Sequence, residues 1–390
     1  MDTLIELYDE RPMENVLATD MFKPRRTVFI CNREAAADRS LERKLKDYIR
    51  YRGLSTELVF MDAKHYSVSS VLATLRQAVS MYPDCTIDIT GGTDDELFAS
   101  GMLCAEKDIP VITYSIKLNR FFNIQNAPEY EDLSCPIRYD AEDFFRMAGG
   151  VMREGRVDNA ILENYFDIID PFFDMFMKNR RKWGDIVSYI QQVSQGPKDQ
   201  PVKLEVTGDY TVKGERGRRI VAPEEELQQL ESIGLLRDLR IERGERVRFA
   251  FKDAQVRKWL RDVGSVLEIY TYKKCMECGL YNDVHTSVVV DWEKNAACDK
   301  VTNEIDVMAV RGVIPVFISC KTCPVTTEAL NELAILRDRF GGKGARAAIV
   351  TTESCRTVTI NRAHELDIEV IEQRDIVSGQ WKERLKIIAK

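Results

Sequence analysis

Two carboxylates and a lysine near the C-terminal end of the chain have a spacing that suits cleavage of a phosphodiester. Glu304 and Asp306 stand two residues apart within Asn303–Val307, and Lys321 lies at the end of the run Val316–Thr322. Residues at positions i and i+2 of a strand share a face. Carboxylates on one face can hold a hard divalent cation, which offsets the charge of a phosphate and lowers the pKa of a bound water. The pattern therefore suggests metal-dependent cleavage of a phosphodiester.

A β-hairpin would bring these side chains together. A two-residue turn at Arg311–Gly312 would place Glu304 across from Ser319. Asp306 and Lys321 would then lie on the same side of the hairpin, because side chains alternate along each strand. We expect one acidic site beside one lysine.

The elements around this hairpin follow the order helix, three strands, helix and two strands. Their predicted bounds are Gln255–Tyr272 and Thr326–Phe340 for the helices, and Val284–Asp291, Glu304–Val310, Val313–Cys320, Ala347–Thr351 and Ile368–Ile371 for the strands. Glu268 lies on an otherwise apolar stretch of the first helix. It is either a third carboxylate that reaches the hairpin or a solvated helix position, and the spacing alone leaves both open.

Two C-x-x-C pairs offer a competing interpretation. Cys275 and Cys278 form one pair, and Cys320 and Cys323 form the other. Four thiolates can bind zinc, but about 41 residues separate the pairs, against the ~15–20 typical of a compact zinc site. Structural zinc is therefore the less favoured alternative.

The first part of the chain alternates strand and helix patterns, which predicts a parallel sheet with helices on its faces. The predicted strands are Leu4–Tyr8, Thr27–Asn32, Ser55–Met61, Thr86–Thr90 and Val111–Ser115. The predicted helices include Val71–Met81 and Asp95–Lys107, the second of which follows a cap at Thr93-Asp94.

A glycine pair at the end of the fourth strand marks a candidate ligand loop. The segment is Asp88-Ile89-Thr90-Gly91-Gly92-Thr93. Open parallel sheets bind ligands at the carboxyl ends of their strands, and the N-terminus of the next helix favours phosphate. Asp94 and Asp95 would oppose an anion, so the motif is weak when taken alone.

The middle of the chain is mainly helical. Helical patterns cover Ala160–Met177, Asp185–Ser194 and Glu224–Ser232, and a short strand is predicted at Val247–Phe251. A helix followed by a hairpin fits a small winged-helix-like module, and a helical connector fits equally well. Two basic clusters, Lys178–Lys182 and Lys213–Arg219, are either phosphate contacts or solvated faces.

Composition limits the class of protein. The chain has 390 residues, of which 44% are hydrophobic and 31% are charged, and a net charge of −7. That charge argues weakly against nonspecific coating of nucleic acid. No apolar run approaches the ~20 residues of a membrane span, and the first residues do not resemble a signal peptide. We therefore expect a cytoplasmic protein without membrane partners, whose ten cysteines are thiols.

The C-terminal third resembles the PD-(D/E)xK, or restriction-endonuclease-like, nucleases. The order of Glu268, Glu304-Ile305-Asp306 and Ser319-Cys320-Lys321 matches that core. The whole chain resembles the type III CRISPR-associated ancillary nucleases, which join a CARF sensor domain to such a nuclease. The motifs that carry this wider resemblance are Asp88–Thr93, Gly264–Glu268, Asn303–Val307, Ile318–Thr322 and Phe340-Gly341-Gly342.

The resemblance implies an α/β fold with three parts. They are a Rossmann-like CARF domain at residues 1–140, a winged-helix-like connector at 141–254, and a restriction-endonuclease-like domain at 255–390. It also implies a homodimer that binds cyclic oligoadenylate, with cyclic tetra-adenylate as the expected ring, across the dimer axis. The implied activator contacts are Thr90, Gly91, Gly92 and Thr93, with Asn15, Asn32, Arg33 and Ser115 as weaker candidates.

The same resemblance implies a site for Mg²⁺ or Mn²⁺. Its metal ligands would be Asp306, Glu304, Glu268 and the backbone carbonyl of Cys320, and its catalytic residues would be Asp306, Lys321, Glu304 and Glu268. The family pattern has an acid two residues before the lysine, where this chain has Ser319. Glu328 or Glu332 of the following helix could supply the missing carboxylate.

The implied function is an activator-dependent, metal-dependent endonuclease in antiviral defence. Its expected substrates are single-stranded DNA or RNA, with nicking of duplex DNA as a further activity. The alternative is a ligand-gated nucleic-acid-binding regulator without nuclease activity, which would use the middle module. Degradation of the activator by the CARF domain itself is a third reading that the sequence leaves open.

Overall fold

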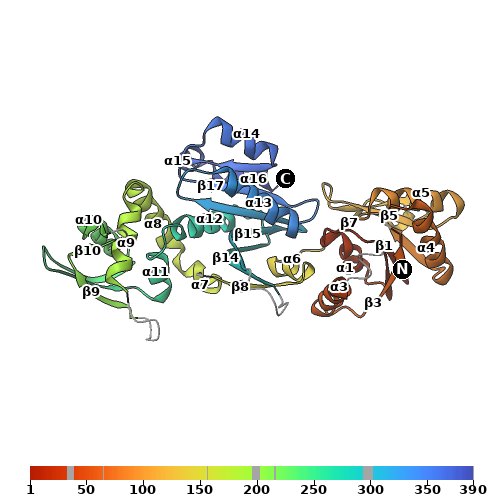
Figure 1. Cartoon of the computed structure of the whole chain (residues 1–390), viewed down its shortest axis with the longest axis horizontal. Coiled ribbons are helices and arrows are strands. Elements are labelled where there is room, and N and C mark those ends of the chain that lie inside the picture. The colour runs from red at the N-terminus through yellow and green to blue at the C-terminus, as the bar shows by residue number, and fades with distance from the viewer. Residues whose placement is uncertain are drawn as a thin grey trace.

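The chain folds into a row of three modules whose order in space differs from their order in the sequence (Figure 1). The N-terminal module lies at one end, the C-terminal module lies in the centre, and the middle of the sequence forms the other end. This computed structural model describes residues 1–32, 39–64, 66–155, 157–195, 203–214, 217–292 and 302–389. The α/β class predicted from the sequence is confirmed.

A seven-stranded sheet of order β3-β2-β1-β4-β5-β6-β7 forms the centre of the N-terminal module. Strands β1 to β5 run parallel, and β6 and β7 extend the β5 edge as antiparallel strands. All five predicted strands are present. The bounds are β1 Thr3–Leu7, β2 Arg26–Asn32, β3 Glu57–Ala63, β4 Cys85–Asp88, β5 Val111–Ser115, β6 Arg120–Gln125 and β7 Leu133–Ser134.

Helices cover both faces of this sheet, which explains why its central strands are buried and mostly apolar, with Glu6 and Asp88 as acidic exceptions. Helices α1 and α3 share a buried cluster with one face, and α4 and α5 share another with the opposite face. Helix α5 begins at a capping box on Thr93, as the sequence predicts. The bounds are α1 Leu17–Phe22, α3 Arg39–Tyr51, α4 Val68–Met81 and α5 Asp94–Glu106.

The middle of the sequence forms a helical module with small sheets. Phe172 and Phe176 each pack edge-on against Trp183, with ring centroids 5.8 and 5.6 Å away. Helix α10 is followed by the hairpin β12–β13, which β9 completes as a third strand, so the module is winged-helix-like. The bounds are α7 Asn159–Leu162, α8 Phe166–Asn179, α9 Trp183–Val193, β9 Glu205–Asp209, β10 Thr211–Lys213, β11 Arg219–Val221, α10 Glu224–Ser232, β12 Leu236–Glu242, β13 Arg246–Phe251 and α11 Ala254–Trp259.

A six-stranded mixed sheet of order β18-β17-β16-β15-β14-β8 forms the central module. Helix α12 shares a buried cluster with one face, and α13 shares a second cluster with the other. The bounds are α12 Ser265–Cys278, β14 Asp283–Trp292, β15 Thr302–Arg311, β16 Ile314–Lys321, α13 Thr327–Phe340, β17 Arg346–Thr351, α14 Thr357–Glu365, β18 Ile368–Ile371, α15 Gln373–Val377 and α16 Trp381–Ile388.

One edge strand of this sheet comes from a distant part of the sequence. Strand β8, Gly150–Glu154, pairs antiparallel with β14 from Glu154↔Val288 to Gly150↔Trp292. It lies within 141–254, the range that we assigned to the connector. The chain therefore enters the central sheet before it builds the middle module.

The single helix predicted at Gln255–Tyr272 is wrong, because the chain breaks it into α11 and α12. Asp262 Oδ2 accepts hydrogen bonds from the backbone N–H of Gly264 at 3.1 Å and of Ser265 at 2.8 Å. A carboxylate that satisfies the first amides starts a new helix. Glu268 consequently lies in the first turn of α12.

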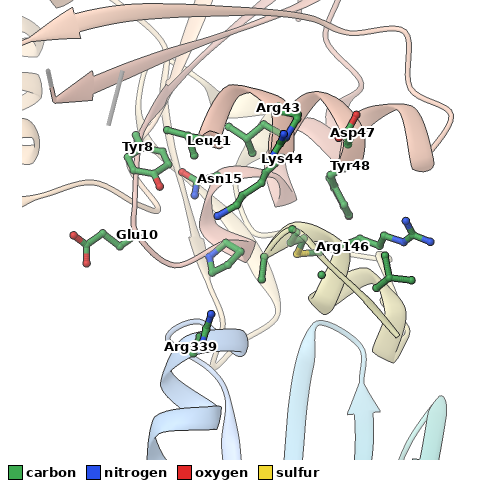
Figure 2. Close-up of a pocket in the computed structure, with 17 residues that line it drawn as sticks. Tyr8, Glu10, Asn15, Leu41, Arg43, Lys44, Asp47, Tyr48, Arg146 and Arg339 are labelled. Carbon is green, nitrogen blue, oxygen red and sulfur yellow. The ribbon is translucent and has the colours of Figure 1, made fainter. Parts of the chain in front are cut away.

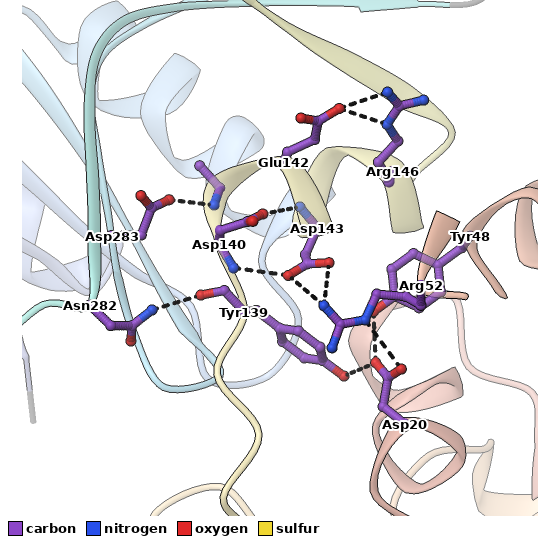
Figure 3. A network of polar contacts seen from close by, with 11 residues as sticks. Asp20, Tyr48, Arg52, Tyr139, Asp140, Glu142, Asp143, Arg146, Asn282 and Asp283 are labelled. Atoms are coloured by element: carbon purple, nitrogen blue, oxygen red, sulfur yellow. Dashed lines mark hydrogen bonds and ion pairs between the residues drawn. The ribbon is translucent and has the colours of Figure 1, made fainter. Parts of the chain in front are cut away.

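A buried polar network joins the N-terminal module to the central one (Figure 3). The Asp20 carboxylate accepts hydrogen bonds from the hydroxyls of Tyr48 at 2.7 Å and Tyr139 at 2.8 Å. Arg52 lies between Asp20 and Asp143, 3.4 and 3.1 Å from their nearest oxygens. The network continues to β14 through helix α6, Ala141–Met147, because the Ala141 N–H donates to Asp283 at 2.7 Å. Charged and hydroxyl groups thus join the two modules, alongside a buried apolar cluster that both modules share.

Two expectations from composition concern membranes and cysteines. Among the described residues, the helices are all too short or too polar to cross a membrane. The nine cysteines that the structure describes are free thiols, as predicted.

Candidate functional site

The β15–β16 hairpin turns one residue later than predicted. Arg311 pairs with Ile314, so the turn residues are Gly312 and Val313. This register, extended along the strands, places Ser319 opposite Asp306, and the predicted pairing of Ser319 with Glu304 is wrong. Moving a two-residue turn by one position shifts the register by two residues, which returns every side chain to its original face. The predicted face therefore holds even though the pairing does not.

The two strands of the hairpin separate where the acidic residues lie. Their ladder ends at Val307↔Ile318, whereas β16 stays paired with β17 as far as Lys321↔Thr351. Strand β15 likewise stays paired with β14. Because the strands separate here, the backbone N–H of Cys320 donates its hydrogen bond to the Asp306 side chain instead of to the backbone of β15. A slot thus opens in the middle of the sheet.

Asp306 is the centre of this slot, because three donors converge on its Oδ2 atom. The Cys320 backbone N–H donates at 2.7 Å, the Ser319 hydroxyl donates at 3.1 Å, and the Lys321 ammonium nitrogen lies 3.6 Å away. Such contacts fix the position of the carboxylate. Its second oxygen, Oδ1, makes none of these three contacts. Asp306 is therefore oriented, with one oxygen left for a ligand.

A small pocket of about 80 Å³ lies beside this carboxylate. One wall comes from the hairpin and the other from α13, which contributes Glu332. Glu304 completes the acidic rim, and its Oε1 atom lies 3.4 Å from the Ser287 hydroxyl of β14. The lining residues are Glu304, Ile305, Asp306, Ile318, Ser319, Lys321, Ala329, Glu332, Leu333 and Leu336.

Glu268 approaches the same strand from the other side of the sheet. Cys320 turns its thiol toward α12, where the sulfur lies 3.5 Å from the Thr271 hydroxyl. Burial raises the pKa of this thiol well above its ordinary value, and the charges of Asp306 and Glu268 add to the shift. The structure thus gathers Glu304, Asp306 and Lys321 around one pocket, and it leaves Glu268 beside the buried thiol.

The pocket has the carboxylate oxygens that a hard cation prefers, but they are not yet arranged around one point. Asp306 and Glu304 offer carboxylate oxygens, and Glu332 offers another across the pocket. Glu304 and Glu332 are both exposed, so their side chains have room to reorient. In the described part of the chain, no three His, Cys, Asp or Glu side chains are already placed to hold a metal ion.

The two C-x-x-C pairs face different surroundings. Cys278 lies in α12 with its sulfur 3.0 Å from the carbonyl oxygen of Cys275, and both thiols are buried. Cys320 is buried against α12, whereas Cys323 is exposed. This arrangement gives the zinc alternative no support.

The glycine loop after β4 lies at the carboxyl edge of the N-terminal sheet, as predicted. Gly92 has a φ of +93°, and a side chain there would come within 2.6 Å of Leu7 Cβ. A side chain on Gly91 would lie 3.1 Å from the Leu7 carbonyl oxygen. Only glycine therefore lets this backbone pass so close to the end of β1.

The threonines of this loop are engaged in local structure. Thr90 donates to the Asp88 carboxylate from its hydroxyl and its N–H, and its hydroxyl accepts the Tyr114 N–H at 2.9 Å. The Thr93 N–H donates to the Glu96 carboxylate at 2.9 Å in the capping box. Ligand contacts from this loop would therefore come mainly from its backbone.

The weaker activator candidates lie at the same edge. Asn15 is buried and donates to the Asp9 carbonyl at 2.7 Å, which shapes the loop after β1. Ser115 ends β5 and Asn32 ends β2. Arg33 lies outside the described residues.

A second pocket, of about 530 Å³, lies where the N-terminal module meets the central one (Figure 2). Tyr8 reaches it from the end of β1, Asn15 from the short 3-10 helix Met13–Asn15, and Arg339 from the end of α13. Its charged lining residues are the basic Arg43, Lys44, Arg146 and Arg339 and the acidic Glu10 and Asp47. Of the predicted activator residues outside the glycine loop, Asn15 lines this basic pocket, and Asn32 and Ser115 do not.

The buried carboxyl beneath the glycine loop predicts a pH-dependent stability. Burial raises the pKa of Asp88 from 3.8 to about 6, although the two hydrogen bonds from Thr90 oppose the shift. Because the folded state binds this proton more tightly, the contribution of Asp88 to stability falls as the pH rises from 3.8 to about 6. We expect the free-energy advantage of Asp88→Asn over the natural chain to grow by about 2–3 kcal/mol between pH 4 and pH 8.

Thermal melting at both pH values measures this difference. The exposed Asp84, in the turn before β4, supplies the matched control, since Asp84→Asn should show no such dependence. An Asp88→Asn effect that is equal at both pH values would contradict the assignment of a raised pKa.

One residue near this edge was not anticipated from the sequence. Lys343 belongs to the α13–β17 loop of the central module, and its ammonium group donates to the Thr90 carbonyl at 3.0 Å. The signal was a lysine between glycines, Gly341-Gly342-Lys343-Gly344, which is an unusual composition for a simple helix–strand connection.

The comparisons with known proteins agree with this geometry. Residues 254–387 match the family model described as "Card1-like, endonuclease domain". The crystal structure of protein VC1899 from Vibrio cholerae superposes with a TM-score of 0.74 at 17% identity and covers 100% of this chain and 97% of its own. The structure of Can2 from Sulfobacillus thermosulfidooxidans in complex with cyclic tetra-adenylate gives 0.70 at 15% identity, with 100% of both chains covered. A search of curated proteins finds no match.

The two superpositions show that the fold extends over the whole chain, and the family match covers the module that holds the acidic pocket. These findings agree with the resemblance found from the sequence: residues 254–387 match a Card1-like endonuclease domain, and the whole chain has the fold of VC1899 and Can2.

Proposed function

We propose that this chain is a type III CRISPR ancillary endonuclease that cleaves single-stranded DNA or RNA, and nicks duplex DNA, when cyclic oligoadenylate is bound. The observation that carries the proposal is the oriented Asp306 carboxylate beside Lys321 and the acidic pocket. It lies within the segment that matches a Card1-like endonuclease domain. We expect the protein to act in the cytoplasm.

The catalytic roles follow from the position of each side chain. Asp306 and Glu304 would hold Mg²⁺ or Mn²⁺ together with Glu332 and the backbone carbonyl of Cys320, whereas Glu268 lies on the α12 side of the sheet, away from the residues that line this pocket. A bound ion would lower the pKa of a coordinated water and offset the phosphate charge. Lys321, held 3.6 Å from Asp306, would orient the attacking water or stabilise the negative charge that develops on the phosphate.

Glu332 is our candidate for the carboxylate that the family pattern has where this chain has Ser319. Ser319 donates its hydroxyl to Asp306, so it orients a ligand and is a poor ligand itself. Glu332 lines the pocket, whereas the other candidate, Glu328, lies in the first turn of α13 and is exposed. We therefore propose that the acid missing from the strand is supplied from α13.

The proposed activator is cyclic tetra-adenylate, bound between the N-terminal modules of a homodimer. Can2, which has the same fold, was solved with this ligand. The backbone of Thr90–Thr93 and the basic pocket of Figure 2 would contact its phosphates. A two-fold ligand suits an isologous dimer, because each subunit offers the same contacts.

A ligand-gated regulator without nuclease activity is the second candidate, and the winged-helix-like middle module favours it. Its proposed phosphate contact, the run Lys178–Lys182, is partly occupied. Lys182 forms an ion pair with Glu226, and Arg180 lies 3.9 Å from Glu353. These pairings reduce the charge that the run can offer to a nucleic acid.

Cleavage assays with and without each component test the proposal. We expect the purified chain to cut labelled single-stranded DNA or RNA only when Mn²⁺ or Mg²⁺ and cyclic tetra-adenylate are both present. Chelation of the metal with EDTA should abolish cutting. Cleavage that is indifferent to the activator would remove the sensor role. Tight, sequence-dependent binding of duplex DNA without cleavage in either metal would favour the regulator.

A further inference from the structure

The loop between α13 and β17 leaves the central module and lies on the ligand edge of the N-terminal module. Three polar contacts anchor it through Lys343. Its backbone N–H donates to the Glu14 carboxylate at 2.8 Å, and its ammonium nitrogen lies 3.0 Å from the Thr90 carbonyl oxygen and 3.9 Å from Asp9 Oδ2. Thr90 opens the glycine loop, so this lysine touches the predicted activator site from another module.

The loop is shaped for this close approach. Gly342 has a φ of +69°, and a side chain there would come within 2.8 Å of the Glu14 carboxylate. A side chain on Gly344 would come within 2.2 Å of Ile116, which follows β5. The positive φ of Gly342 favours glycine, the backbone of Gly344 lies close against Ile116, and both positions touch loops at the carboxyl edge of the N-terminal sheet. The contact between the two modules therefore includes the backbone of this loop as well as the Lys343 side chain.

Lys343 is a cation among buried acids. Glu14 is 1% exposed, and burial raises its pKa, while the N–H and the charge of Lys343 oppose that shift. The charge of Lys343 also opposes the rise that burial causes in the pKa of Asp88. A phosphate that arrived at the glycine loop would attract Lys343 and be repelled by these carboxylates. Acids and ligand would thus compete for one ammonium group.

Helix α13 connects this contact to the acidic pocket. The helix has 14 residues, which corresponds to roughly 21 Å. Near its first turns, Glu332 and Leu333 line the pocket beside Asp306, and its last residue, Phe340, is buried just before the loop. Close-packed protein interiors have low compressibility and transmit strain. A displacement of Lys343 would therefore reach Glu332.

We propose that Lys343 is a positioning residue that couples the activator loop to the catalytic pocket through α13. A phosphate-bearing ligand at Thr90–Thr93 draws the ammonium group away from the Thr90 carbonyl and Asp9, and α13 carries that movement to Glu332. The inference rests on the proposed function, because it takes cyclic oligoadenylate as the ligand and phosphodiester cleavage as the output.

The test compares Lys343→Ala, Lys343→Met and Lys343→Arg with the natural chain in the full-length protein. For each we would measure the dissociation constant for cyclic tetra-adenylate and the ratio of cleavage rates with and without it. We expect Lys343→Ala and Lys343→Met to lower the activation ratio about tenfold at saturating activator, within the usual range of coupling between sites. Lys343→Arg should restore most of it. Lys386→Ala, which removes an exposed lysine of α16 paired with Glu383, should leave the ratio unchanged.

Hydrogen exchange adds a readout that a loss of folding would not imitate. Activator should change the protection of residues 341–345 and of α13 in the natural chain, and this change should be absent in Lys343→Met. If the natural chain is activated and Lys343→Met is activated to the same ratio, the coupling proposal is overturned and the proposed function stands. If the natural chain neither binds cyclic tetra-adenylate nor responds to it, the proposed function fails first.

Discussion

Replacement of Asp306 by asparagine should reduce cleavage by at least about 1,000-fold at saturating activator and Mn²⁺. Asparagine keeps the acceptor for the Cys320 N–H and the Ser319 hydroxyl, so the fold of the hairpin should survive. It removes the negative charge that would bind the cation and that pairs with Lys321. Initial rates on a labelled single strand, with the melting temperature of the same sample, measure the effect.

Two glutamates of α13 provide the matched comparison. Glu332 lines the pocket, and Glu332→Gln should lower the rate about tenfold by loss of one carboxylate ligand. Glu328 is exposed at the start of the same helix, and Glu328→Gln should have no effect. Full activity of Asp306→Asn would remove the site assignment, and equal effects of the two glutamine variants would remove the role given to Glu332.

The second large effect is expected at the joint between the modules. Asp20→Ala should lower the free energy of unfolding by about 3–5 kcal/mol, because it leaves buried donors without their acceptor. Asp20 is 3% exposed and receives the hydroxyls of Tyr48 and Tyr139 (Figure 3). Burial and the Asp20 charge raise the pKa of the Tyr139 hydroxyl well above its ordinary value, so this hydroxyl stays a donor at neutral pH.

Thermal melting measures this loss, and Asp47→Ala is its control. Asp47 lies on α3 and pairs with Arg50 at 3.1 Å, but both side chains are largely exposed. Exposed pairs contribute little, so the melting temperature should barely change. A small effect of Asp20→Ala would mean that the joint depends on apolar packing instead of on this network.

Helices and strands that are marked by a pattern within their own residues could be predicted from the sequence. The central strands of the N-terminal sheet are mostly apolar and β-branched, apart from Glu6 and Asp88, so each could be placed from its own residues. The break before α12 was missed, because it depends on one side chain, Asp262, that captures the next two amides. Strand β8 was missed because its partner β14 lies more than a hundred residues away, and nothing local marks such a pairing.

For the candidate site, too, the pattern within each strand was predicted, and the contacts between elements were not. Strand periodicity was enough to put Glu304, Asp306 and Lys321 on one face, and that face survives the error in the turn. Periodicity says nothing about how neighbouring elements pack, so it could not choose between Glu268 and the glutamates of α13. The position of Lys343 depends on two modules meeting, which no pattern within one module encodes.

The path of the chain through β8 has a consequence for what can be separated. The chain passes through the central sheet, leaves to build the middle module, and returns at α12, so the middle module is an insertion within one folding unit. Loss of that insertion would keep the strand pairing of the sheet but uncover α12, whose buried residues share one apolar cluster with the middle module. Expression of residues 254–387 alone would strip β14 of its neighbour and expose a row of unpaired amides and carbonyls, which favours aggregation. We therefore expect the smallest folding unit that keeps the β8–β14 pairing to begin near Gly150.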